Sequence, residues 1–498
     1  MDRAAIAHEG AKRVAKEPQR PDAYGAEISS RRILFATPEI SDFVKVGGLG
    51  VVSAALPRAL RRFADVRVLI PGYREVVEGR FPLERVGELP GLADIPSCEL
   101  GRLTARDGLT VYALLRPELF ARAGTPYADG EGRPWADADL RFARLSLAAA
   151  QMAAGLGDPS WTPAVLHLND WPTAMAAGYL EWLGIRAPSV MTIHNLAFQG
   201  LFPRDRLAGL GVPEAAFSLN GIEFHGQLSY LKAGVYYASH VTTVSETYAR
   251  EITRSEYGCG LHGLLEGRAR EGKLTGILNG IEDDWELATG DAVRAPVDRE
   301  AWKGANAEAV RKSFGLAVSK GPLFAIISRL VHQKGVDLSI EAADEIIAAG
   351  GQIIATGSGE KRFEDAILEL GRRHPGAVGV NIGFHDGEAR RIFAGSDFLL
   401  MPSRFEPCGL TQMYAQKSGS LPIAHRTGGL ADTIEDGKTG FLFNNADSAD
   451  ALTRTVRRAT AAFASRGRLD AMRRHAMSQD FAWTRPAGRY GAVYQSLA

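Results

Sequence analysis

Cysteine is scarce in this sequence, and its placement is as informative as its number. The chain has three cysteines, Cys98, Cys259 and Cys408, which lie far apart. An odd number of widely separated cysteines excludes a disulfide framework and a cysteine-rich zinc site, and it is typical of a reducing compartment. No group of His, Cys, Asp and Glu has metal-ligand spacing, and no signature of a nucleophilic triad is present. We therefore expect no metal ion and no other cofactor.

The chain also lacks a net charge and a long apolar run. Lysine and arginine together number 58, as do aspartate and glutamate, so no overall field attracts nucleic acid or an anionic membrane. No segment approaches the ~20 apolar residues of a membrane-spanning helix. Residues 1–30 are polar and lack the apolar core of a signal peptide. We expect a cytoplasmic protein that binds neither nucleic acid nor membranes, with residues 1–30 as a disordered extension.

The first half of the chain alternates short apolar runs with helical stretches. The apolar runs, which are typical of strands buried on both faces, cover residues 32–37, 66–71, 165–168, 189–194 and 240–245. A loop with two glycines and a predicted helix over residues 53–63 separate the first two runs. This order of strand, loop, helix and strand is the unit of a parallel α/β sheet.

A second series of apolar runs follows. It covers residues 323–328, 351–357, 378–382, 398–402 and 421–424, with predicted helices between them such as residues 339–349. A polar stretch without strand character, residues 283–320, separates the two series and is the predicted crossing between domains. At 498 residues the chain is too long for one ordinary core. We predict two doubly wound α/β domains that face each other across a cleft, with ligands at the carboxyl ends of the strands.

Polar residues follow several strands of the first series. Lys45 precedes Gly47 and Gly48 in the loop after the first strand, where backbone N–H groups and a lysine can bind a phosphate. The spacing matches neither the P-loop nor the dinucleotide fingerprint, and a tight turn with a solvated lysine explains it equally well. Asp170 and the pair His194 and Asn195 follow two further strands. Each alone is more often structural, but strand ends of one sheet converge.

In the second series, cations and a carboxylate follow strands. Arg329 and Lys334 come after the run at 323–328, where they are suited to a diphosphate or are merely solvated. Glu406 comes after the run at 398–402, just before a predicted helix. The amides of Gly409, Leu410 and Thr411 would begin that helix and offer a second anion site. The alternative is that Glu406 only caps the helix.

These segments carry a family resemblance. Over residues 31–494 the chain resembles bacterial glycogen synthases and plastid starch synthases. The matching segments, in the same order and spacing, are residues 45–49, 167–171, 192–200, 229–234, 277–281, 328–335 and 402–412.

The resemblance implies a GT-B fold with an acceptor domain at residues 31–280, a nucleotide-sugar donor domain at residues 281–478, and a terminal helix at residues 479–498 that returns to the first domain. It also implies transfer of glucose from ADP-glucose to the non-reducing end of an α-1,4-glucan such as glycogen, with retention of anomeric configuration.

The resemblance further assigns roles to residues. It implies that Arg329 and Lys334 hold the donor diphosphate above the amides of residues 409–411, and that Glu406 binds the hydroxyls of the donor sugar. His194, Asn195 and Asp170 would line the glucose pocket, and the Lys45 loop would close over the phosphates. The remaining residues that it implies for the donor site are Tyr127, Asn279, Phe384 and Cys408, with Phe384 stacking on the base where the family usually has tyrosine.

The sequence departs from the family pattern at three places. Val51 stands where the glycine loop usually has an aspartate, Asn169 and Pro172 flank Asp170 and Trp171 where histidines are usual, and His262 replaces a common glutamate. Two alternatives therefore stay open. One is a glucosyltransferase that uses UDP-glucose or makes short oligosaccharides, and the other is a weakly active regulatory paralogue that binds glucan.

Overall fold

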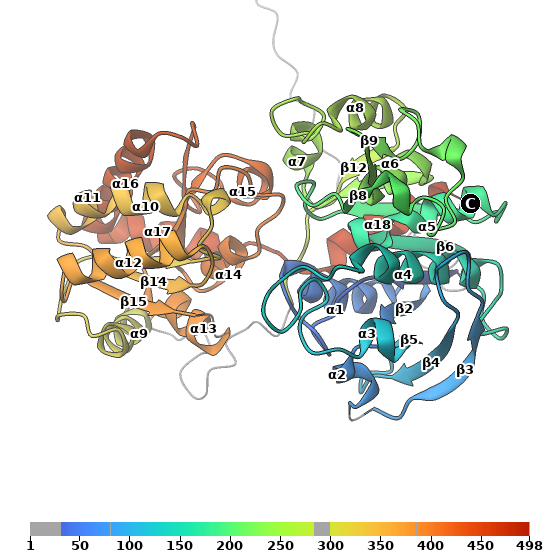
Figure 1. Cartoon of the computed structure of the whole chain (residues 1–498). Coiled ribbons are helices and arrows are strands. Elements are labelled where there is room, and N and C mark those ends of the chain that lie inside the picture. Colours follow the sequence, from blue (N-terminus) through green and yellow to red (C-terminus); the bar gives the residue numbers. More distant parts are fainter. Residues whose placement is uncertain (1–30, 80, 283–298, 384–385, 498) are drawn as a thin grey trace, which may run out of the picture.

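The computed structural model describes residues 31–79, 81–282, 299–383 and 386–497. Two α/β domains lie side by side, each built around its own sheet (Figure 1). The predicted doubly wound architecture is confirmed. The predictions for residues 1–30 and for Phe384 lie outside the described residues.

The first sheet has nine strands in the order β12-β11-β7-β6-β1-β2-β5-β4-β3. The strands from β12 to β5 are parallel, and β4 and β3 extend the sheet in antiparallel pairing. Their bounds are β1 Arg32–Ala36, β2 Asp65–Pro71, β3 Glu84–Leu89, β4 Cys98–Thr104, β5 Thr110–Leu115, β6 Val165–Asn169, β7 Ser189–Ile193, β11 His240–Thr243 and β12 Leu274–Gly276.

The second sheet has six strands, all parallel, in the order β15-β14-β13-β16-β17-β18. Their bounds are β13 Leu323–Ile327, β14 Gln352–Gly357, β15 Val378–Ile382, β16 Phe398–Met401, β17 Leu421–His425 and β18 Phe441–Phe443. The strand order reverses between β13 and β16, and the first sheet reverses between β1 and β6. Ligands of doubly wound sheets bind beyond the strand ends at such reversals.

Helices cover both faces of the parallel sheets. Those of the first domain are α1 Gly48–Leu60, α2 Arg74–Val77, α3 Pro117–Phe120, α4 Ala138–Ala153, α5 Trp171–Trp182, α6 Tyr230–Tyr237, α7 Glu246–Glu251 and α8 His262–Arg270, beside a small sheet of β8 Leu201–Pro203, β9 Glu223–Phe224 and β10 Gln227–Ser229. Those that follow are α9 Arg299–Ser313, α10 Val336–Glu341, α11 Ala343–Ala348, α12 Lys361–Arg373, α13 Asp386–Gly395, α14 Thr411–Lys417, α15 Gly428–Thr433, α16 Ala449–Ala464, α17 Arg466–Met477 and α18 Thr484–Ser496.

Two predicted helix boundaries were wrong. The helix expected from residue 53 begins at Gly48, because Gly47 is its N-cap and the glycine loop itself forms its first turn. The helix expected over 339–349 is two short helices that begin at Val336, just after Gly335 in a left-handed conformation. Glycine lowers helix propensity by only about 1 kcal/mol, which packing against a sheet readily overrides.

The chain crosses between the domains along one seam. The outgoing segment near Ile281 and the returning segment near Ala482 form a parallel bridge. A small apolar cluster joins the two domains at this place, made of Val244, Ile281, Cys408, Met413 and Phe481. Helix α18 then lies against α1 of the first domain (Figure 1). Its Tyr494 hydroxyl lies 2.7 Å from Nδ1 of His167 inside that core.

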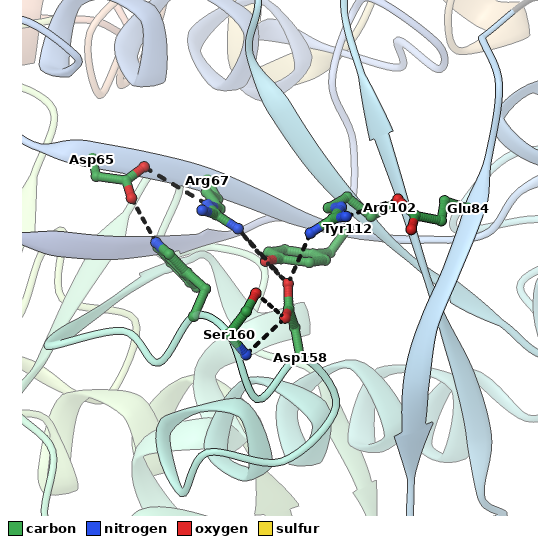
Figure 2. A network of polar contacts seen from close by, with 8 residues as sticks. Asp65, Arg67, Glu84, Arg102, Tyr112, Asp158 and Ser160 are labelled. Carbon is green, nitrogen blue, oxygen red and sulfur yellow. Dashed lines mark hydrogen bonds and ion pairs between the residues drawn. The ribbon is translucent and has the colours of Figure 1, made fainter.

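A buried polar network joins strands β2, β4 and β5 of the first sheet near the amino-terminal ends of its parallel strands. Asp158 accepts hydrogen bonds from Tyr112 at 2.7 Å and from the amide of Ser160 at 3.0 Å, and Arg67 and Arg102 lie within ion-pair distance (Figure 2). Burial alone would raise the pKa of Asp158, but these hydrogen bonds and Arg102 lower it below its usual value. The network stabilises the sheet at a distance from the strand ends that carry the candidate site.

Within the described residues, no helix has the length and apolar character needed to cross a membrane.

Candidate active site

The glycine loop after β1 forms the N-terminus of α1 and leaves open space in front of it. A Cβ added to Gly47 or Gly48 would meet no other atom within 4 Å. Packing therefore gives no reason for glycine at either position, whereas close approach of a ligand to the backbone does. Lys45 is exposed beside this loop.

Glu39, which was not predicted from the sequence, forms hydrogen bonds that fix the glycine loop. Its carboxylate accepts hydrogen bonds from the amides of Val46 at 2.7 Å and Gly47 at 3.2 Å, and from the Tyr127 hydroxyl at 3.2 Å. Burial raises the pKa of Glu39, although these hydrogen bonds and the charge of Lys45 oppose the rise. Tyr127, predicted for the donor site, thus contacts Glu39 beneath the glycine loop and packs against the core of the first domain. The position of Glu39, just after β1 at the strand reversal, is the signal that could have found it.

Asp170 organises the polar groups at the ends of β6 and β7. It has a backbone φ of 58°, a conformation that costs free energy in residues other than glycine and persists where the surroundings impose it. Its Oδ1 accepts from the amides of His194 at 3.0 Å and Asn195 at 3.4 Å. The predicted convergence of these three residues is what the structure shows.

Burial shifts the pKa values of Asp170 and His194 in this cluster. Burial raises the pKa of Asp170 to about 7, and the charge of Glu39 adds to the rise. Burial lowers the pKa of His194 to about 3, so its ring is neutral at pH 7. Nε2 of His194 lies 3.0 Å from Oδ1 of Asn169, which fits a ring that donates from Nε2 and keeps Nδ1 as an acceptor.

On the second domain, the loops after β13 and β16 lie against each other at the strand reversal. The Arg404 amide donates to Gln333 at 2.8 Å, and the Gln333 side chain donates to the carbonyl of Phe405 at 3.2 Å. Gly335 has a φ of 65°, and a Cβ there would stand 2.1 Å from the carbonyl oxygen of Pro402. Only glycine fits this contact, which brings the two loops together.

This contact places Lys334 beside Glu406. Lys334 Nζ lies 2.5 Å from Oε2 of Glu406, and the Ser403 hydroxyl donates to the same oxygen at 3.1 Å. Glu406 is 5% exposed, so its charge is compensated inside the protein. Arg329, by contrast, is exposed, and within the described ranges its guanidinium has no hydrogen-bond or ion-pair partner.

The start of α14 offers unpaired backbone donors. Gly409 has a φ of 70°, and the Gln412 side chain fixes the turn by donating to the carbonyls of Cys408 at 3.1 Å and Gly409 at 2.9 Å. In the part of the chain that the structure describes, the amides of Gly409, Leu410 and Thr411 donate to no protein acceptor. Half-exposed N–H groups of this kind suit an anion.

Two residues predicted for the donor site lie at the crossing between the domains. Cys408 is 5% exposed within the apolar cluster of the seam, and burial raises the pKa of its thiol to about 12. Asn279 is equally buried and hydrogen-bonds to Cys408. Their side chains therefore face the crossing between domains. No group of three or more potential metal ligands occurs in the described segments.

Two family descriptions match the chain. One, Starch synthase catalytic domain, covers residues 32–267, and the other, Glycosyl transferases group 1, covers residues 310–470. The chain is 56% identical over 461 residues to glycogen synthase 1 of Bradyrhizobium diazoefficiens, covering 92% of this chain and 100% of that protein. It is 52% identical over 494 residues to glycogen synthase of Pseudomonas putida, covering 97% of this chain and 95% of that protein.

Solved structures agree with this grouping. The catalytic domain of starch synthase IV from Arabidopsis thaliana, bound to ADP and acarbose, superposes with a TM-score of 0.81 at 29% identity, covering 94% of this chain and 99% of that one. Sucrose-phosphate synthase from Thermosynechococcus elongatus gives a TM-score of 0.59 at 17% identity, covering 94% and 99%; at that identity only the fold is shared. The fold is GT-B, as the sequence resemblance implied.

Proposed function

Because the chain belongs to the family of bacterial glycogen synthases and starch synthases, it is a glycosyltransferase, and we propose that its donor is ADP-glucose and its acceptor the non-reducing end of an α-1,4-glucan. The observation that carries the proposal is the group of unpaired donors at the strand reversal of the second domain. Arg329 and the amides of Gly409, Leu410 and Thr411 have no protein partner among the described residues, and together they suit a diphosphate.

The pair of Lys334 and Glu406 supports a division of labour in this half of the site. A lone carboxylate beside a diphosphate would repel it, but Glu406 already forms an ion pair with Lys334 at 2.5 Å. Glu406 can then accept hydrogen bonds from sugar hydroxyls, while Lys334 remains within reach of a phosphate. We assign residues 281–478 to donor binding on this basis.

The first domain, residues 31–280, is the proposed acceptor domain. Asp170, His194 and Asn195 would line the glucose pocket from this side, with the neutral His194 ring able to accept a hydrogen bond from a sugar hydroxyl. The open space before Gly47 and Gly48 suits approach of the Lys45 loop to the phosphates on domain closure. Residues 479–498 return the chain to this domain.

The proposed reaction is a displacement on one face of the sugar with an oxocarbenium-like transition state. The bond between the anomeric carbon and the diphosphate oxygen breaks, and the acceptor hydroxyl forms the new bond on the same face. The hydroxyl proton passes to an oxygen of the departing phosphate. Arg329, Lys334 and the amides at residues 409–411 stabilise the charge that develops on the leaving group, and closure excludes water.

A donor panel tests the proposal. The purified chain is assayed with ADP-glucose and with UDP-glucose, using glycogen and short maltooligosaccharides as acceptors, and the products are analysed for linkage. We expect kcat/KM to be at least about tenfold higher with ADP-glucose, a difference of about 1.4 kcal/mol, and new α-1,4 linkages on glycogen. A preference for UDP-glucose or for short products would replace the assigned substrates. Glucan binding without transfer from either donor would contradict the activity.

A further inference from the structure

One short helix of the first domain reaches the backbone around Glu406. Helix α7 ends at Glu251, whose carboxylate accepts hydrogen bonds from the Gly428 amide to both of its oxygens at 3.1 Å and from the Thr427 hydroxyl at 3.0 Å. Glu251 is 8% exposed. Since Thr427 and Gly428 follow β17 of the second domain, these bonds cross the seam between the domains.

Gly428 in turn lies directly against Glu406. A Cβ on Gly428 would stand 1.9 Å from the carbonyl oxygen of Glu406, and the next amide, that of Gly429, donates to the same oxygen at 3.1 Å. A side chain at position 428 would collide with this carbonyl, so the two backbones are in direct contact. A shift of Gly428 therefore shifts the backbone of Glu406.

The N-terminus of α7 holds the residue after Glu406. Ser245 caps the helix by accepting from the Tyr248 amide at 3.1 Å, and its hydroxyl donates to the carbonyl of Pro407 at 2.6 Å. The N-terminal end of α7 thus contacts Pro407 directly, and its C-terminal end holds Gly428, which lies against Glu406.

The middle of α7 holds the loop of the first domain that carries His194. The Tyr248 hydroxyl accepts from the Leu196 amide at 3.1 Å, two residues beyond His194. Helix α7 and its N-cap therefore contact both halves of the candidate site, the loop that carries His194 and the backbone next to Glu406.

The burial and charge of Glu251 argue against a role limited to holding the two domains together. Burial raises its pKa and the charge of Asp432 adds to the rise, while the hydrogen bonds from Gly428 and Thr427 and the charge of Arg254 oppose it. Its neighbours Tyr248 and Tyr257 are neutral, and the described residues give it no ion-pair partner. A buried carboxylate without a counter-ion is costly, and a neutral or apolar side chain would join two domains at lower cost.

We propose that Glu251 is a positioning residue that sets Glu406 in register with the His194 loop through Gly428. The inference rests on the role proposed above for Glu406. A carboxylate can hold the Gly428 amide with both oxygens and the Thr427 hydroxyl at once, which fixes the turn more tightly than a single acceptor. Misplacement of a reacting group by about 1 Å lowers rates by about a hundredfold.

Steady-state kinetics with ADP-glucose and glycogen test this role. Glu251→Ala should lower kcat by about tenfold to a hundredfold, with the donor KM changed by less than about threefold and ADP affinity by calorimetry unchanged. Glu251→Gln, which keeps an oxygen for the Gly428 amide, should recover most of kcat. The matched control is Asp432→Asn, which weakens a separate contact between α7 and α15, the hydrogen bonds that Thr247 donates to Asp432, and should leave kcat within about twofold of wild type.

Three results would overturn the inference: an unchanged kcat in Glu251→Ala, an equal loss in Asp432→Asn, or a loss in Glu251→Ala that matches the loss of folded protein. Glu406→Ala separates the two claims. If Glu406→Ala abolishes transfer and Glu251→Ala does not, the positioning role alone fails. If Glu406→Ala keeps full kcat, the role of Glu406 itself fails.

Discussion

Lys334 and Glu406 form an ion pair, with Nζ 2.5 Å from Oε2, across the two loops that meet at the strand reversal of the second domain. The family resemblance implied that the lysine holds the diphosphate and that the carboxylate binds the sugar, and the ion pair explains how both groups can lie in one site. Each group lowers the cost of burying the other. In the proposed donor site, positive charge for the phosphates then comes from Arg329, and the amides at residues 409–411 add hydrogen-bond donors without net charge.

The first prediction concerns this pair. Lys334→Ala leaves the carboxylate of Glu406 buried without a counter-charge, which should lower the unfolding free energy by about 1–3 kcal/mol. The double variant Lys334→Ala/Glu406→Ala removes both charges and should recover part of that loss. Urea unfolding of the four proteins of the cycle measures the coupling. Additive effects of the two substitutions would show that the pair carries no coupling energy.

The second prediction separates ligand approach from packing. Gly48→Ala should raise the unfolding free energy by up to about 1 kcal/mol, because alanine is the better helix former and no atom obstructs its Cβ. The same change should raise the KM for the donor, since the methyl group enters the space in front of the loop. Gly304→Ala, in α9 and equally unobstructed, is the control and should stabilise without changing KM. An unchanged donor KM in Gly48→Ala would show that the loop does not contact the donor.

The third prediction is a pH dependence from Asp170, whose pKa burial raises to about 7. The ionised carboxylate is the stronger acceptor for the His194 and Asn195 amides, so kcat/KM should rise as the pH passes through about 7. Asp170→Asn should be slower and lack this rise. The sign for stability is opposite. A carboxyl whose folded pKa lies above its unfolded value of 3.8 keeps its proton longer in the folded state, so its contribution to the unfolding free energy falls between about pH 4 and 7. An identical rise of kcat/KM in Asp170→Asn would assign the titration to another group.

The fourth prediction concerns the glycine that brings the two loops together. Gly335→Ala meets the carbonyl of Pro402 and keeps a φ of 65°, so it should cost about 3 kcal/mol or more and lower kcat by displacing Lys334. Gly350→Ala has a φ of 78° but no atom within 4 Å of its Cβ, so it should cost only about 1–2 kcal/mol and leave kcat unchanged. Thermal unfolding and kcat of both variants test this difference. Equal costs would mean that the contact with Pro402 contributes nothing.

Much of the fold was predictable because parallel strands buried on both faces leave continuous apolar runs. All ten apolar runs named from the sequence overlap observed strands. Helix starts at Gly48 and Val336 were missed, since glycine-rich loops give no periodic signal. The convergence of Asp170 with His194 was predictable, because the strands before them are neighbours in a parallel sheet.

The rest of the site could not be predicted from the sequence. Glu39 could have been suspected from its position just after β1, but no motif indicates that its carboxylate accepts hydrogen bonds from the amides of Val46 and Gly47. The motif around Cys408 predicted a donor site at its backbone, but it did not indicate which way the Cys408 side chain points. The structure places this residue in the apolar cluster of the seam. Sequence spacing does not encode that direction.

Arg329→Ala gives the most direct test of the donor half of the site. The guanidinium is exposed and makes no bond within the described residues, so its removal should leave the melting temperature unchanged. Arg454→Ala, exposed on α16, is the control and should behave as wild type. The measurement is the single-turnover rate constant for glucosyl transfer from ADP-glucose to glycogen. We predict a fall of about a hundredfold or more in Arg329→Ala, and an unchanged rate constant would contradict the assignment of the diphosphate site.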